Sequence, residues 1–410
     1  MKILYFGTIC NEKRFVEICK KSLVKPSAAP QNFETLLING FDGLPNVEID
    51  ANTFPPVPAF PKGYTLFWGR KIDNLTEKID ARWIPALNIQ VIKQICLFIF
   101  SFCFTLLWLV KNWREKRKTI LLYSIYMPVA YGTLVLAKLA KCNIVVIVPD
   151  LPRFMFTYSR QKGIKNKLIP CYLYLTKIIE SKFDGYILLT DYMNGLVNTK
   201  NKPYVIVEGI GNIDEYLNDD QPILGDKAKR AIMYAGTLNE KFGIKILIDA
   251  FDTIKDDSLE LWLFGNGDME KELEKASLED SRIRYFGRKA KKEILEYEKK
   301  ATILVNIRPT EDEYTKYSFP SKTIEYMASG TPLLTTRLPG MPEEYFSYCY
   351  TVEDETKQGV GDAITRVLNL PNEELISMGK RARDFIINNK NSKIQAKKIY
   401  NYLEMLLCKE

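Results

Sequence analysis

The chain of 410 residues contains no histidine. Histidine is the usual ligand of zinc in proteins and the side chain that most often transfers protons near neutral pH. Its absence excludes an imidazole-built zinc site and a histidine general base. Proton transfer must therefore use carboxylates, Tyr, Lys or the substrate itself, and we expect neither a metal site nor a cofactor.

The eight cysteines include no Cys-x-x-Cys pair, and most lie in apolar segments, as buried free thiols do. Internal repeats and low-complexity tracts are absent. The first residues, MKILYFG, read as a β-strand and not as a cleavable signal peptide, because they lack a long apolar core. These features predict a globular protein of the reducing cytoplasm, with two domains in the available length.

Acidic residues are scarce in the first half of the chain. Residues 1–210 carry 28 basic and 15 acidic residues, a net charge of +13, whereas residues 211–410 carry 30 and 35, a net charge of −5. The asymmetry predicts that the amino-terminal half faces an anionic partner such as a membrane surface. We do not expect nucleic acid, because the basic runs at 111–118 and 159–170 belong to no motif that reads it.

No apolar run is long enough for a straight membrane span. The longest, 95–110, has 16 residues without a charge, and a span needs roughly 20. A span would also separate the strands before and after it, so we reject it. Two alternatives stay open: a buried helix, or a helix that dips into a membrane surface with Trp113 and the basic run at headgroup level.

Strand-like apolar runs alternate with helical stretches along the whole chain, which predicts an α/β fold with doubly wound parallel sheets. The first series lies at 3–6, 36–38, 120–124, 144–148, 185–190 and 204–207. The second lies at 231–235, 259–264, 283–286, 303–306 and 332–336. A polar join near 212–229 divides the chain into domains at 1–211 and 212–390, followed by a helical tail, 391–410, that crosses back to the first domain.

The segment 317–336, YSFPSKTIEYMASGTPLLTT, carries the strongest chemical signal. A helix that opens near 318–321 directs unpaired amides and its positive dipole end at an anion. Ser321, Lys322 and Glu325 share one helix face by their spacing. Lys322 can hold a phosphate while Glu325 accepts hydrogen bonds from the paired hydroxyls of a ribose. The alternative is an ordinary helix, turn and buried strand.

Glycines join strands to helices in two further segments. MYAGTLNEKFGIKILIDAF places Gly236 after a strand and Lys241 before a helix, where a diphosphate can meet an ammonium and helix amides. LWLFGNGDMEKELEKA ends its strand in Gly265, Asn266 and Gly267, a weak signal of nucleotide binding. Arg288, just past the next strand, is placed to line or stack on a base.

In order and spacing, these segments resemble the carboxy-terminal domain of the retaining nucleotide-sugar glycosyltransferases of family 4, which have the GT-B fold. The resemblance is strong over about 204–345 and weaker elsewhere. It implies two Rossmann-like domains facing a central cleft. The second domain would bind a nucleotide diphosphate sugar, expected to be a UDP-sugar, and the acceptor would lie against the first.

Carried over residue by residue, the resemblance implies that Gly236 and Lys241 bind the diphosphate. Glu325 matches the second Glu of the family's E-x7-E motif, which holds the ribose, and Arg288 lies near the base-binding loop. The resemblance also implies donor contacts from the glycine turns and from the start of the helix: Thr237, Gly265, Asn266, Gly267, Tyr317, Ser318, Phe319, Ser321 and Lys322.

Three departures from the family pattern matter. Thr237 stands where an Arg usually follows the turn glycine, so Lys322 or Arg308 is expected to replace the missing cation. Tyr317 stands at the first Glu of E-x7-E, which changes how the donor sugar is gripped. Pro320 stands where the family has a glycine, and it donates no amide, so phosphate contacts must shift to its neighbours.

The first domain contributes three candidates. Asp150, in IVPDLPRF after a strand, is expected to face the cleft, although an Asp in this position is also common as a turn or cap residue. Gly7 and Thr8 follow the first strand and resemble the loop that faces the donor phosphates, with a simple tight turn as the alternative.

Lys241, Glu325 and Asp150 are the predicted catalytic residues. Negative charge develops on the leaving diphosphate, and preorganised cations and amides lower that barrier most. The resemblance implies attack from the front face, in which the acceptor hydroxyl passes its proton to the departing phosphate. That scheme needs no histidine and no metal.

We therefore expect a hexosyl- or related transferase that works with retention on a lipid-linked or polysaccharide acceptor in cell-surface glycan biosynthesis, at the inner face of the cell membrane. One alternative is an inactive partner subunit that binds a nucleotide sugar, which the departures at Thr237 and Tyr317 would suit. Another is a nucleotide-sugar 2-epimerase, against which the missing histidine argues.

Overall fold

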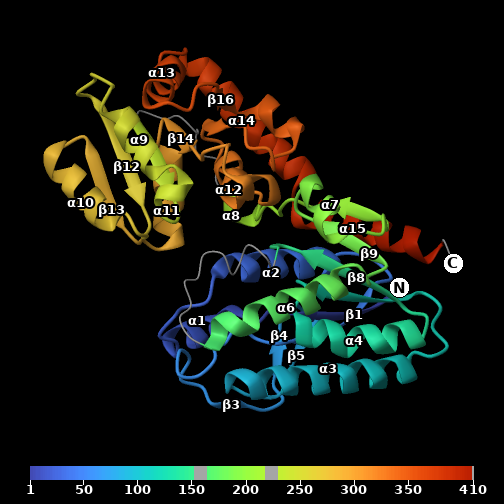
Figure 1. Cartoon of the computed structure of the whole chain (residues 1–410). Helices are drawn as coiled ribbons and strands as arrows, with labels where there is room; N and C mark the ends of the chain where they lie inside the picture. Colours follow the sequence, from blue (N-terminus) through green and yellow to red (C-terminus); the bar gives the residue numbers. More distant parts are fainter. Residues whose placement is uncertain (152–163, 218–229, 409–410) are drawn as a thin grey trace. The chain divides into compact units, whose positions relative to one another are not determined.

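The structure is a computed structural model that describes residues 1–151, 164–217 and 230–408. The chain forms two compact units (Figure 1). Unit 1 contains Met1–Ile210 and Ser392–Glu410, and unit 2 contains Gly211–Asn391. Unit 1 is thus built from both ends of the chain, with unit 2 inserted between them.

Unit 1 is built on an eight-stranded sheet in the order β10-β9-β8-β7-β1-β2-β5-β4. Neighbouring strands are parallel except β4 and β5. Its strands are β1 (Lys2–Gly7), β2 (Glu48–Thr53), β4 (Ile72–Asn74), β5 (Asp80–Trp83), β7 (Lys118–Tyr123), β8 (Asn143–Val148), β9 (Gly185–Leu188) and β10 (Tyr204–Ile206). The segments before β4 and after β5 form a small antiparallel pair, β3 (Phe67–Trp68) and β6 (Ala86–Leu87).

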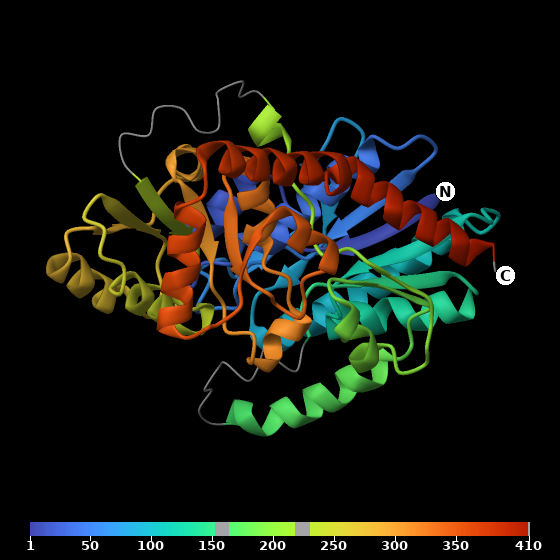
Figure 2. The same cartoon turned by 90° about the horizontal axis from the view of Figure 1, so that it is seen from above.

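Helices cover both faces of this sheet. Figure 1 shows α2 (Ala28–Asp42) on one side and α4 (Met127–Leu139), with α3 (Gln90–Lys111) beyond it, on the other. The last helix, α15 (Ser392–Leu407), packs against α2 and runs along unit 1 in both views (Figure 2). Buried side chains of β1 such as Ile3 meet Leu37 of α2 and Ile399 of α15 in one apolar core. The remaining helices of the unit are α1 (Glu12–Lys20), α6 (Ile164–Glu180) and α7 (Asn194–Val197).

Helix α3 is long and apolar enough to cross a membrane by length and composition, with a mean hydropathy of 2.0 over its most apolar window. It does not separate two parts of a sheet, because β1, before it, and β7, after it, are hydrogen-bonded neighbours. One face, with Ser101 and Thr105, is buried, whereas side chains on the other face, such as Leu107, are exposed. A wholly buried helix is therefore wrong, whereas contact with a membrane surface stays a prediction.

Unit 2 has a six-stranded parallel sheet in the order β13-β12-β11-β14-β15-β16. Its strands are β11 (Arg230–Ala235), β12 (Leu259–Phe264), β13 (Ile283–Gly287), β14 (Ile303–Asn306), β15 (Leu333–Thr336) and β16 (Tyr350–Val352). Its helices are α8 (Asp214–Leu217), α9 (Ile244–Phe251), α10 (Glu270–Glu279), α11 (Lys291–Lys300), α12 (Ser321–Ser329), α13 (Lys357–Leu368) and α14 (Asn372–Asn389). The strand order reverses between β11 and β14, and ligands of such sheets bind outside the carboxyl ends of the strands at this point.

The predicted doubly wound α/β architecture is confirmed, and most predicted strands are found within a residue or two. The strand predicted at 36–38 is wrong, because these residues lie inside α2. Their apolar side chains continue a helical face that includes Phe33 and Phe41. The short strands β3, β4, β5, β6 and β16 were missed, and so was β2, which has the polar sequence EIDANT and is only partly buried, so it shows no apolar run.

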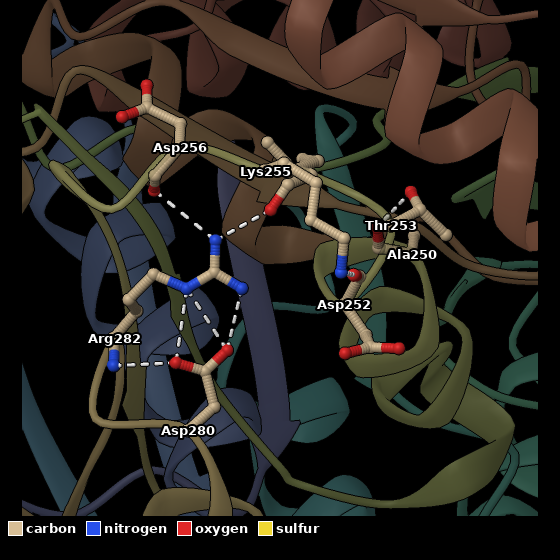
Figure 3. A network of polar contacts seen from close by, with 8 residues as sticks. Ala250, Asp252, Thr253, Lys255, Asp256, Asp280 and Arg282 are labelled. Carbon is tan, nitrogen blue, oxygen red and sulfur yellow. Dashed lines mark hydrogen bonds and ion pairs between the residues drawn. The ribbon is translucent and has the colours of Figure 1, made fainter.

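One arginine ties the amino ends of β12 and β13 together in unit 2. Arg282 donates from Nη2 to Asp280 at 2.7 Å and from Nη1 to the carbonyl oxygens of Ile254 and Asp256 at 2.6 and 3.2 Å (Figure 3). Its guanidinium carbon lies 4.8 Å from the ring centroid of Phe251. This network lies at the end of the sheet opposite to the carboxyl ends of the strands.

We expect Arg282→Met to lower the free energy of unfolding by about 2 kcal/mol, since it leaves two carbonyl groups and a carboxylate without their donor. Calorimetry of the whole chain measures this as a lower melting temperature. Lys275→Met is the control, because Lys275 and its partner Glu279 are 74% and 67% exposed and such pairs contribute little. Equal melting temperatures for the two variants would contradict the structural role of Arg282.

Candidate functional site

A single buried hydroxyl fixes α12 against the end of β11. Oη of Tyr326 accepts a hydrogen bond from the Ala235 amide at 2.7 Å and donates one to the Ala235 carbonyl oxygen at 3.0 Å. The helix begins after Pro320, and no side chain caps its first turn. Its positive end therefore lies at the carboxyl edge of the sheet, where the strand order reverses.

Lys322 and Glu325 form an ion pair on this first part of α12. Nζ of Lys322 lies 2.5 Å from Oε2 of Glu325, and both side chains are a little over one quarter exposed. Burial works against the ammonium of Lys322, but Glu325 and Glu298 more than offset it and raise the pKa of Lys322. The lysine is therefore a cation under ordinary conditions, with part of its charge balanced inside the protein.

Beneath this pair lies a carboxyl group that the sequence did not suggest. Glu298 of α11 is fully buried, and in the described part of the chain neither of its carboxyl oxygens has a hydrogen-bond partner. Burial raises its pKa to about 8, an effect that Lys322 reduces and Glu325 increases. Glu298 is consequently protonated at neutral pH, and its neutral form leaves the positive charge of Lys322 in place.

The turn after β11 approaches α12 from the other side. Tyr234 packs under it: its Oη donates to the Thr237 carbonyl oxygen at 3.2 Å, and a Cβ added to Gly236 would lie 2.9 Å from that same Oη. Thr237 itself is exposed. Lys241 follows in a short 3-10 helix, and its Nζ lies 4.9 Å from the ring centroid of Phe242.

The glycines of the β12 turn serve close packing of two loops. Gly265 has φ of +128°, and a Cβ there would lie 1.8 Å from the Gly236 carbonyl oxygen. A Cβ at Gly267 would lie 2.1 Å from the carbonyl oxygen of Leu238. The Gly265 amide donates to Gly287, whereas Asn266 is exposed between the two glycines. The absence of side chains at these glycines therefore lets the turns after β11 and β12 pack against each other.

The other predicted donor residues surround the start of α12 less tightly. Ser318 and Tyr317 are half-buried, Phe319 is buried against Tyr345 with 5.2 Å between ring centroids, and Ser321 is exposed. Arg288 is exposed one residue past β13. The Gly265 amide bond to Gly287 keeps the loop that carries Arg288 beside the glycine turn of β12.

In unit 1, a buried carboxylate occupies the loop after β1. The Thr8 amide donates to both oxygens of Glu34, at 3.0 and 2.9 Å, and its hydroxyl bonds the same group. Tyr5 donates to Glu34 at 2.6 Å, and a Cβ on Gly7 would collide with the carboxylate. Burial raises the pKa of Glu34 to about 7 although these hydrogen bonds oppose the shift. The amide of Thr8 is thus used within unit 1.

Asp150 follows β8 in unit 1. Its side chain keeps an exposed surface, but neighbouring atoms shield the carboxyl group, and this desolvation raises its pKa to about 6. Burial raises the pKa of Tyr123, and the charges of Glu34 and Asp150 add to this shift. Two carboxyl groups therefore lie near the carboxyl ends of β1, β7 and β8. In unit 1, the predicted residues Thr8 and Asp150 therefore lie near the same group of side chains, Glu34 and Tyr123.

Among the residues of these clusters that were not predicted are Tyr326, Glu298 and Glu34. The signal for Glu34 was present, because it is a lone carboxylate on the apolar face of α2 with Leu37 and Phe41. Nothing local marks Glu298, which is one of several charged residues on a very polar helix.

Residues 229–370, about a third of the chain, match the family model described as "Glycosyl transferases group 1". The matched segment lies within unit 2 and contains Gly236, Lys241, Lys322 and Glu325. A search of curated proteins finds no match.

Solved structures resemble the whole chain. They include α,α-trehalose 6-phosphate synthase from Burkholderia multivorans (TM-score 0.65, 11% identity, 99% of each chain covered). Another is Anabaena Alr3699/HepE in complex with UDP and glucose (0.59, 12%, 98% of this chain and 99% of that one). A third is the lipopolysaccharide outer core galactosyltransferase WaaB in its apo form (0.62, 12%, 99% of each). At these identities the likeness shows the fold, and it confirms the predicted GT-B architecture.

The buried Glu298 predicts a pH-dependent stability. Its pKa is raised from 4.5 to about 8 on folding, so the folded chain binds more protons between these values. The free energy of unfolding should therefore fall as the pH rises through this window, by at least about 1 kcal/mol. In Glu298→Gln, urea denaturation at a series of pH values should show a flatter profile.

Glu296→Gln, on the exposed face of the same helix, should keep the slope of the intact chain. A slope that survives in Glu298→Gln would assign the pH dependence to other groups.

Proposed function

We propose that the protein is a glycosyltransferase that moves a sugar, with retention, from a nucleotide diphosphate sugar to a lipid-linked or polysaccharide acceptor. The observation that carries this proposal is the Lys322–Glu325 pair, which Tyr326 holds against the Gly236 turn inside a group 1 glycosyl transferase domain. One cation and one carboxylate at the reversal of the strand order suit a diphosphate and a ribose.

Glu325 is proposed to hold the ribose hydroxyl groups. Lys322 contacts Oε2, and within the described residues no partner occupies Oε1. A carboxylate offers about four acceptor sites, so it can bind the lysine and the ribose together. The Anabaena protein of the same fold was solved with UDP and glucose, which supports a UDP-sugar as the donor here.

Lys322 and Lys241, with the uncapped amides of α12, are proposed to stabilise the negative charge that develops on the leaving diphosphate. The acceptor hydroxyl then attacks from the face that the diphosphate leaves. In this step the bond from the sugar to the acceptor oxygen forms, the bond to the diphosphate breaks, and the acceptor proton passes to the departing phosphate. Asp150 is proposed to orient the acceptor hydroxyl.

The acceptor is proposed to be presented at the inner face of the cell membrane. On α3, apolar side chains stand exposed along the helix: Val91, Ile92, Ile95, Phe98, Ile99, Leu106, Leu107 and Val110. Trp113 is 69% exposed just beyond the helix, and Arg114 stacks on it at 4.8 Å. An apolar face beside an amphipathic aromatic and cations suits the boundary between acyl chains and anionic headgroups. Residues 159–163 of the basic run at 159–170 lie outside the described residues.

A second candidate function rests on the neutral side chains at Thr237 and Tyr317. An inactive subunit that binds a nucleotide sugar for a partner would tolerate both. It differs from the first candidate in turnover and not in donor binding.

Donor binding is tested with a panel of nucleoside diphosphates and their sugars in thermal unfolding. A ligand at 100 times its dissociation constant stabilises the folded state by about 2.7 kcal/mol. We expect one nucleotide sugar to raise the melting temperature of the intact chain, and to have a much smaller effect on Glu325→Ala and Lys241→Ala. Lys245→Ala, an exposed lysine of α9, serves as the control.

If no compound of the panel stabilises the intact chain, the donor site is absent and the transferase proposal fails. If the donor binds but radiolabelled sugar is never transferred to a membrane lipid extract, the inactive subunit is the better reading.

Membrane binding is tested by flotation with vesicles of phosphatidylethanolamine and phosphatidylglycerol. Replacing the exposed Leu107 and Val110 together by Gln removes roughly 2 kcal/mol of apolar transfer for each side chain that enters the lipid, so we expect at least a tenfold loss of binding. The control Leu278→Gln changes a side chain of α10 that is 88% exposed. Equal flotation of the variant and the intact chain would contradict contact through α3.

A further inference from the structure

The β11 turn of unit 2 lacks one expected charge. Thr237, the residue after the turn glycine, is exposed and neutral, so the turn brings no cation of its own to a diphosphate until Lys241. A diphosphate carries two or more negative charges, and Lys322 is already paired with Glu325 at 2.5 Å. Another cation is needed at this edge of the sheet.

Arg308 stands at the matching position of the neighbouring strand. β11 and β14 pair in parallel with Ile232 opposite Ile303 and Met233 opposite Leu304. Thr237 and Arg308 are each the second residue past the end of their strand, since β11 ends at Ala235 and β14 at Asn306. Adjacent paired strands lie about 4.8 Å apart, so a long side chain just past the end of one strand can reach the space beyond the end of the other.

The contacts of Arg308 agree with this position. Its guanidinium carbon lies 4.7 Å from the ring centroid of Phe242, the ring on which Lys241 also rests. Burial raises the pKa of Tyr234, under the Gly236 turn, and the charges of Arg308 and Lys322 partly offset that shift. Both cations therefore lie close enough to the turn to act on the same hydroxyl.

Arg308 keeps its donors available. Nε donates to Oδ1 of Asn306 at 3.2 Å, whereas in the described part of the chain neither terminal nitrogen donates a hydrogen bond and no carboxylate pairs with the guanidinium. A half-buried guanidinium with two open nitrogens offers the fork that binds phosphate oxygens.

The backbone under Arg308 is held from two sides. Thr336 donates from its hydroxyl to the Arg308 carbonyl oxygen at 2.7 Å. Gly243, with φ of +80°, lies so close beneath the strand end that a Cβ there would collide with the Ile307 carbonyl oxygen. The backbone that carries the Arg308 side chain is thus held in one position, as a preorganised cation requires.

We propose that Arg308, just past the end of β14, binds the diphosphate of the donor. It supplies the positive charge that Thr237, just past the end of β11, lacks. This inference rests on the proposed function. It assigns Arg308 as a cation in addition to Lys322 and Lys241, because Lys322 shares its charge with Glu325 whereas Arg308 has no acidic partner among the described residues.

The test compares nucleoside diphosphates with the matching monophosphates by isothermal titration. The probes are UDP, GDP, ADP, CDP and dTDP with UMP, GMP, AMP, CMP and dTMP, and the pair whose diphosphate binds tightest is used. We expect the preference for diphosphate over monophosphate to fall at least tenfold in Arg308→Met and only partly in Arg308→Lys. Adding Thr237→Arg to Arg308→Met should restore the preference. Arg366→Met, an exposed arginine of α13, is the control.

Thermal unfolding without nucleotide shows whether each variant keeps its fold. A variant that is less stable but keeps the diphosphate preference would give Arg308 a structural role only and overturn the inference. An unchanged preference in a stable Arg308→Met would overturn it too, while the proposed function stands. If the intact chain binds no nucleoside diphosphate, the proposed function fails and this inference with it.

Discussion

The candidate site depends on the hydroxyl of Tyr326. At the end of β11, this one group satisfies both the amide and the carbonyl of Ala235, main-chain groups that a further strand pair would otherwise have used. The strands β11 and β14 can therefore part at their carboxyl ends without leaving buried polar groups unpaired. The helix that carries Tyr326 also carries Lys322 and Glu325 one turn or less before it.

Charge around this opening is arranged in layers. Nearest the sheet edge lie Lys322 and Glu325, and below them lies Glu298, which burial keeps protonated at neutral pH. Lys322 and Glu325 balance each other, so a second ionised carboxylate at that depth would make the cluster negative. Desolvation of Glu298 thus keeps the side chains at the helix start from becoming net negative, which would oppose an anionic leaving group.

Much of this organisation could be predicted from the sequence because its signals are local. The glycine turn, the spacing of Lys322 and Glu325, and the buried apolar strands all follow from a few consecutive residues. What could not be predicted depends on partners distant in the sequence. Tyr326 of α12 bonds Ala235 at the end of β11, and Thr8 after β1 bonds Glu34 of α2.

The same distinction explains the one misplaced strand. Leu36, Leu37 and Ile38 look like a strand over three residues, and only the longer helical period of α2 identifies them. β2 is polar because it lies near the edge of the sheet, so its identity depends on neighbours and not on its own composition. The membrane contact of α3 and the roles of the site residues stay predictions until measured.

The return of α15 to unit 1 has a consequence for the order of events at the ribosome. The core of unit 1 includes Ala396, Ile399 and Leu403, which follow the whole of unit 2 in the chain. Unit 2 is contiguous and can fold as soon as it emerges, whereas unit 1 must wait with part of its apolar surface uncovered until the end of translation. Until α15 has been synthesised, unit 1 is therefore the part of the protein that most needs a chaperone or a membrane surface to cover its apolar side chains.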